Sequence, residues 1–134
     1  MEVNWDNVPD ADSYEPLPDG IYEVCVENCV EALTKAGDTQ FRLELVVTSP
    51  HAQGRKLFDS ILFKDGPAMQ RAKLVCHRLG FLTEGMQTIE PREFIGRECF
   101  VVVSGVREYE KDGKTYKQNV IPFDGYRSKE EDVL

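Results

Sequence analysis

Apolar and polar residues alternate with a period of two from Gly20 onward, which predicts a β-strand with one buried face. The predicted buried face consists of Tyr22, Val24, Val26 and Val30, and the opposite face carries Glu23, Glu27 and Glu31. The sequence Lys-Ala-Gly-Asp at 35–38 has turn chemistry and ends this strand.

A second alternating segment follows the turn. Its predicted inward residues are Phe41, Leu43, Leu45 and Val47, and its predicted outward residues are Arg42, Glu44 and Thr48. A turn over 49–54 contains a proline and a glycine and separates it from a third strand at about 56–63. The third strand is apolar on both faces, which is typical of a strand that is mostly covered.

The hydrophobic period then changes to that of a helix. Pro67 suits the first helical position, Asp65 is the expected cap, and Gly80 suits the position after the last turn. The predicted buried face of the helix consists of Ala68, Ala72, Val75, Cys76 and Leu79. Its predicted exposed side carries Gln70, Arg71, Lys73 and Arg78.

Two more strands are predicted after the helix, a long one at 97–109 and a closing one at 115–123. Asp112-Gly113 lies at the centre of the hairpin turn between them. Three strands, one helix and two strands are the order of a mainly β, five-stranded OB-fold-like barrel with one α-helix between strands 3 and 4. An α+β sandwich shares this order.

The charge is unevenly distributed along the 134 residues, which carry a formal net charge of −8. Residues 1–19 hold six acids and no Lys or Arg, and we interpret them as an extended N-terminal arm. The predicted domain at 20–126 has 15 acids and 14 bases, and an acidic tail follows at 127–134. The net charge therefore excludes a histone-like basic protein and little else.

The cysteines predict neither a metal site nor a disulfide framework. Cys25 and Cys29 lie four residues apart in a predicted strand, hence on one face but about 13 Å apart, too far for one tetrahedral ion. We expect Cys25, Cys29, Cys76 and Cys99 to be reduced structural thiols, and we expect no metal and no cofactor. The chain has neither an export signal nor an apolar run of about 20 residues, which predicts a cytoplasmic protein without membrane contact.

Three segments carry a resemblance to a known family: LPDGIYEVCV at 17–26, GRKLFDSILF at 54–63 and FIGRECFVVVSGVREYEKDGKTYKQNVIPF at 94–123. They resemble a family of small bacteriophage proteins, long catalogued as uncharacterised, thought to contain OB-fold single-stranded-DNA-binding proteins. The resemblance covers most of residues 15–123. It implies phage DNA replication or recombination, in the host cytoplasm, as the setting.

Single-strand binding needs aromatic faces for stacking beside cations for phosphates. In OB-folds, strands 2 and 3 and the loops joining strands 1–2 and 4–5 form that surface. The candidate nucleic-acid-binding residues there are Lys35, Arg42, Arg55, Lys56, Phe58, Lys64, Arg107, Tyr109, Lys111, Lys114, Tyr116 and Lys117. DNA and RNA would both use such a surface, and the oligomeric state stays open.

Each of these candidates also has an ordinary structural interpretation. A phenylalanine such as Phe58 is more often a core residue than a stacking platform, and Tyr109 with Tyr116 is equally suited to a cross-strand pair that stabilises the hairpin. The hairpin bases alternate with acids, as in a solvated charged hairpin, and Lys56 and Lys64 suit a blunted strand edge.

The end of the chain is a candidate docking element, because a short acidic run finishes in two apolar residues. It is similar in kind to the tails with which bacterial single-strand-binding proteins recruit replication partners, and it consists of Glu130, Glu131, Asp132, Val133 and Leu134. The acidic arm at 1–19 suits packing on the barrel, competition with DNA or solubility alone.

The sequence argues against an enzyme. His51 and His77 lie far apart without a nucleophile elbow, and Asp59 in its apolar strand is expected to pair with Arg55 or Arg97. The sequence therefore predicts a non-catalytic protein that coats single-stranded DNA with little sequence preference. The alternative is an OB-fold adaptor or structural phage protein that binds protein only.

Overall fold

A computed structural model describes residues 1–5 and 16–129 of the chain. The described protein is mainly β, with a single α-helix, α1 (Pro67–Arg78), between the third and fourth strands. Its strands are β1 (Gly20–Leu33), β2 (Thr39–Val47), β3 (Lys56–Phe63), β4 (Glu98–Val103), β5 (Val106–Lys111), β6 (Lys114–Asn119) and β7 (Tyr126–Arg127). Two short 3-10 helices, η2 (Pro50–Ala52) and η3 (Pro91–Glu93), lie in the connections.

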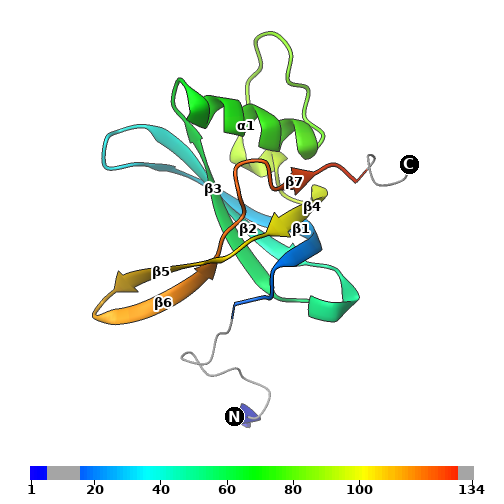
Figure 1. Cartoon of the computed structure of the whole chain (residues 1–134), viewed down its shortest axis with the longest axis vertical. Helices are drawn as coiled ribbons and strands as arrows, with labels where there is room; N and C mark the ends of the chain where they lie inside the picture. The colour runs from blue at the N-terminus through cyan, green and yellow to red at the C-terminus, as the bar shows by residue number, and fades with distance from the viewer. Residues whose placement is uncertain (6–15, 130–134) are drawn as a thin grey trace.

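The main sheet has five antiparallel strands in the order β3-β2-β1-β4-β7. The long strand β1 pairs with β4 through its first half and with β2 through its second half. Because β1 passes from one partner to the other partway along its length, the sheet curls strongly into a half-barrel, which Figure 1 shows with α1 covering one end. Strands β5 and β6 form a separate hairpin that projects from this body.

A β-bulge in β1 changes which side chains point inward. The pairing of β1 with β2 shifts register between Val26 and Asn28, so the alternation restarts one residue later. Tyr22, Val24 and Val26 are buried as predicted, but Cys29 takes the next inward position and Val30 is half exposed. The predicted inward position of Val30 was therefore wrong, because strict alternation ignores the extra residue of a bulge.

The inward side chains of β2 and β3 form the core together with the buried face of α1. All four predicted inward residues of β2 are buried. Helix α1 buries Ala72, Val75 and Cys76 against the sheet, with Leu79 as its C-cap residue. Gly66 rather than Asp65 occupies the N-cap, and no side-chain cap hydrogen bond forms there, so the expected cap was wrong.

The predicted strand at 97–109 is two strands. The strand is interrupted at Ser104-Gly105, where Gly105 has a φ of 84°, a conformation that glycine adopts without strain. The Asp112-Gly113 turn is confirmed, with φ values of 55° and 77° at these two residues. The closing strand ends at Asn119, and the chain then adds β7, which pairs with β4 and was not predicted.

A partly buried polar cluster joins three elements. Asp59 on β3 accepts a 2.8 Å hydrogen bond from Arg71 of α1 and a 2.7 Å hydrogen bond from the hydroxyl of Tyr126 on β7. Burial raises the pKa of the Tyr126 phenol, and the adjacent carboxylate of Asp59 raises it further. Arg71 therefore points inward and is the partner of Asp59, in place of the predicted Arg55 or Arg97.

Breaking this cluster should destabilise the fold. Arg71→Ala leaves the mostly shielded carboxylate of Asp59 without its cation, so we expect a loss of about 2 kcal/mol of unfolding free energy. Tyr126→Phe removes one hydrogen bond and should cost about 1 kcal/mol. Urea denaturation followed by circular dichroism measures both losses. Arg92→Ala, which removes an exposed ion pair with Glu90, is the control, and equal behaviour of all three variants would contradict the assignment.

Candidate nucleic-acid interface

The outward face of β1, β2 and β3 forms the floor of the candidate site. The ladders place Val30, Arg42 and Ser60 side by side in one row and Asn28, Glu44 and Phe58 in the next. Phe58 is 47% exposed, so its ring is available on the surface and is not part of the core. Arg42, exposed in the adjacent row, forms no ion pair within the described residues.

Lys56 on β3 and Lys64, directly after β3, differ in how far nearby carboxylates compensate their charge. Lys56 lies 2.8 Å from the carboxylate of Glu44 and 3.7 Å from that of Glu27, and the hydrogen bond to Glu44 raises the pKa of Lys56. Lys64, at the other end, lies 4.0 Å from Asp38 and is well exposed. The floor therefore offers more uncompensated positive charge toward the β1–β2 loop, which also carries the exposed Lys35.

The register of the β5–β6 hairpin separates its charges by face. Tyr109 pairs with Tyr116, Arg107 with Gln118, and Lys111 with Lys114, so these six residues share one face, here called the tyrosine face. The opposite face carries Glu108, Glu110, Thr115 and Lys117 along its exposed length. The tyrosine face thus combines three cations with two aromatic rings and has no acid in its ladder.

The two tyrosine rings lie against each other as a cross-strand pair. Their centroids are 5.5 Å apart with an angle of 23° between the ring planes, and the residues are 42% and 37% exposed. The cross-strand interpretation of Tyr109 and Tyr116 is therefore confirmed, and the exposed outer surface of the pair remains open to a stacking ligand.

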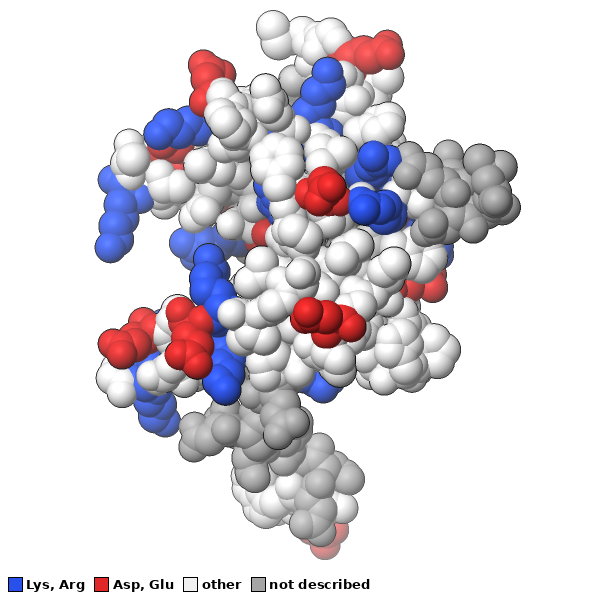
Figure 2. Space-filling view, in the orientation of Figure 1, with Lys and Arg blue, Asp and Glu red and all other residues white. Residues whose placement is uncertain are grey.

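The tyrosine face is turned toward β3. The side-chain amide of Gln118 donates a 3.1 Å hydrogen bond to the carbonyl of Phe58, and Arg107 donates to the same Gln118 at 3.3 Å. Figure 1 shows the β1–β2 loop and the hairpin as two arms on one side of the body, with β2 and β3 between them. In Figure 2 Lys and Arg side chains lie over both arms and in the hollow between them, with acidic side chains also on the hairpin.

Ten of the twelve predicted nucleic-acid-binding residues lie on the elements that border this hollow, here called the groove. The residues that the structure brings to its floor and walls are Lys35, Arg42, Lys56, Phe58, Lys64, Arg107, Tyr109, Lys111, Lys114 and Tyr116. Lys117 lies on the opposite face of the hairpin, and Arg55 lies in the turn that precedes β3. The predicted docking residues at 130–134 lie outside the described residues.

Two residues of the groove were missed. Gln118 lies two positions after Tyr116, so its place on the tyrosine face follows from the Asp112-Gly113 turn and strand alternation. Val30 reaches the outward face only because of the bulge in β1, for which the hydrophobic pattern holds no signal.

The bulge in β1 also puts its two cysteines on opposite faces of the strand. Cys25 is partly exposed on the outward face, whereas Cys29 is buried on the inward face, so the expectation that they share a face was wrong. Burial raises the pKa of Cys29 and Cys76 to about 11 and that of Cys99 to about 12. Within residues 1–5 and 16–129, no group of three or more His, Cys, Asp or Glu side chains is placed to hold a metal ion.

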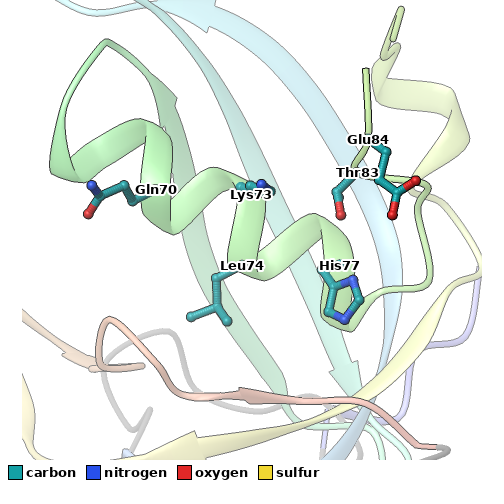
Figure 3. Close-up of a pocket in the computed structure, with 6 residues that line it drawn as sticks. All are labelled: Gln70, Lys73, Leu74, His77, Thr83 and Glu84. Carbon is teal, nitrogen blue, oxygen red and sulfur yellow. The ribbon is translucent and has the colours of Figure 1, made fainter. Parts of the chain in front are cut away.

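The two histidines lie on different elements. His51 of η2 packs on Tyr22, with ring centroids 5.1 Å apart. His77 of α1 borders a shallow hollow of about 430 Å³ on the outer side of the helix, and Figure 3 shows Thr83 and Glu84 from the following loop at its other rim. No hydrogen bond joins His77 to either of them among the described residues. Across residues 1–5 and 16–129, no helix is long and apolar enough to span a membrane.

The fold and the groove define a small β-rich protein with an open, aromatic and cationic surface between two arms. Residues 3–129 match the model of a family described as a protein of unknown function, DUF669, and the chain belongs to this family. No curated protein matches the chain.

Thiol reactivity tests the inward and outward positions of β1. At pH 8 a thiol with a pKa of about 11 is only about 0.1% thiolate, and burial further blocks the reagent, so we expect Cys29, Cys76 and Cys99 to resist iodoacetamide. Cys25 should be the site that reacts in the folded protein, and all four should react in urea. Mass spectrometry of peptides measures this, and labelling of Cys29 as fast as Cys25 would contradict the bulge.

Proposed function

We propose that the protein binds single-stranded DNA without catalysing a reaction, using an OB-fold type of barrel and coating the strand with little sequence preference. The element order supports the OB-fold assignment, since β1 is shared between β2 and β4, and α1 lies between β3 and β4. The hairpin that follows β4 takes the place of the loop that flanks the ligand in such barrels.

The observation that carries the proposal is the separation of charge and aromatic rings by the hairpin register. Stacking of a base on an aromatic ring contributes about 1–3 kcal/mol, and single-strand sites combine such rings with cations that hold the phosphates. Tyr109 and Tyr116 lie between Arg107 and the lysines of the turn on one face, and that face is turned toward Phe58. A charged hairpin that served solubility alone would need no such sorting.

The same chemistry favours unpaired strands over duplexes. Bases in a duplex are stacked on each other and present only their edges, whereas an extended single strand exposes its ring faces. Because every base has such a face, stacking tolerates sequence variation. RNA offers the same rings and phosphates, so it belongs among the competitors in any test.

The biological setting is proposed from the family resemblance of the sequence. Coating of single strands during phage replication or recombination, in the host cytoplasm, would suit a small barrel of this kind. The acidic, apolar-tipped residues Glu130–Leu134 would then recruit a replication or recombination protein.

Binding should be visible as a salt-sensitive change in fluorescence anisotropy of a labelled single strand of about 30 nucleotides. Contacts with about five phosphates predict a log–log salt slope of about −3.5, or about a 100-fold loss of affinity between about 50 and 200 mM salt. Duplex DNA of the same sequence should bind more weakly. Absence of single-strand binding at low salt would overturn the proposal and favour a protein-binding adaptor.

Substitutions in the groove separate stacking from a general loss of fold. Phe58→Ala and Tyr116→Ala should each weaken binding about 5- to 100-fold, because each removes a stacking surface. Phe123→Ala is the matched control, since Phe123 is 49% exposed but lies in the β6–β7 connection. Arg42→Ala should reduce the salt slope by about 0.7, whereas Lys73→Ala on α1 should not. Unchanged affinity in both aromatic variants, with the fold intact, would contradict the stacking role.

A further inference from the structure

The hairpin that carries the tyrosine pair has little packing of its own. Every residue of β5 is exposed, as are the first four residues of β6. A two-stranded hairpin without a packed face is marginally stable in water. Its position therefore depends on the few bonds at its base.

Three of those bonds come from the segment that precedes β1. The side-chain amide of Asn119 accepts from the backbone N–H of Leu17 at 2.9 Å and donates to the carbonyl of Leu17 at 2.8 Å. The carboxylate of Asp19 accepts a 2.8 Å hydrogen bond from the backbone N–H of Gly105. These contacts hold Asn119, the last residue of β6, and Gly105, which directly precedes β5, so both sides of the hairpin base are tied.

The segment is itself fixed to the body, so it can act as an anchor. Leu17 and Asn119 are both buried, with 5% of each exposed. The hydroxyl of Tyr22 donates a 2.6 Å hydrogen bond to the carbonyl of Pro18. Residues 16–19 therefore belong structurally to the barrel, although they fall within the arm predicted at 1–19.

The two faces of the hairpin thus meet different parts of the molecule. Gln118, on the tyrosine face, bonds to Phe58 of β3, and the neighbouring Asn119 points the opposite way to Leu17. Val106, Glu108 and Lys117 line a hollow against Pro16 to Asp19. The hairpin is held between the groove on one side and the segment on the other.

We infer that residues 16–19 are a clamp that sets the angle of the tyrosine face over the groove, with Asp19 and Asn119 as positioning residues for DNA binding. This inference rests on the proposed function. A clamped arm loses less conformational freedom when a strand binds, so the clamp raises affinity without touching the DNA. The side-chain amide of Asn119 pairs with Leu17 as a peptide group would, which Asp cannot do because it lacks the donor.

Asp19 offers a matched pair of variants on the full chain. Asp19→Asn removes the charge but retains an oxygen that can accept from Gly105, whereas Asp19→Ala removes both. Hydrogen exchange should become about 3- to 10-fold faster in the amides of β5 and β6 for Asp19→Ala, with β1 and β2 unchanged. Asp19→Asn should exchange as the wild type does. Unchanged exchange in Asp19→Ala would overturn the clamp.

DNA-binding measurements on the same variants test the positioning role. Asp19→Ala should weaken single-strand binding about 3- to 10-fold relative to Asp19→Asn, although it removes the same negative charge. In a Tyr109→Ala, Tyr116→Ala background the two Asp19 variants should bind equally, which a general loss of stability would not produce. Faster exchange without a change in affinity would overturn the positioning role alone. A wild-type protein that binds no DNA would overturn the proposed function, while exchange still decides whether the clamp exists.

Discussion

The hydrogen-bonded cluster of Asp59, Arg71 and Tyr126 fixes which side chains of β3 point toward the core and which point outward. It joins the consecutive elements β3 and α1 to β7, which is remote from both in sequence, through one carboxylate whose side chain is 16% exposed. A carboxylate in that position must face its partners, because an unpaired charge in a shielded site is costly. Since side chains alternate along a strand, Asp59 turned inward requires Phe58 turned outward. The exposure of the groove's central ring thus follows from the polar bond behind it.

The groove also shows how a chain of net charge −8 presents a cationic surface. In the hairpin, bases and acids follow one another closely, and the linear sequence suggests neutralisation. The antiparallel register sorts them, so that Glu108 and Glu110 lie on one face and Arg107 and Lys111 on the other. Local potential depends on this sorting more than on the total, because salt screens exposed charges beyond about 8–10 Å.

Several features were predictable because each depends on contacts near in sequence. They are the alternation of β2, the limits of β3, the helix and the Asp112-Gly113 turn. The bulge at Val26–Asn28, the break at Gly105 and the pairing of β7 were not, since they depend on the curl of the whole sheet. The inward position of Arg71 has the same origin, because its partner lies on another element. In the groove, the aromatic and cationic residues were predictable by type. Their arrangement on one face required the register.

The floor of the groove and its hairpin arm differ in how they are held, and this bears on how the energy of the proposed DNA binding would be used. Phe58 lies on a strand that is tied to α1 and β7 through its neighbour Asp59, so its position changes little. The tyrosine pair lies on an exposed hairpin whose base is tied by Asp19 and Asn119. In the proposed binding mode, the sheet platform is rigid and the hairpin is held at its base while its exposed outer part can still bend, so successive bases of different size would stack without a fixed spacing. Such an arrangement suits a strand of arbitrary sequence better than two rigid platforms would, since a fixed gap would favour particular bases.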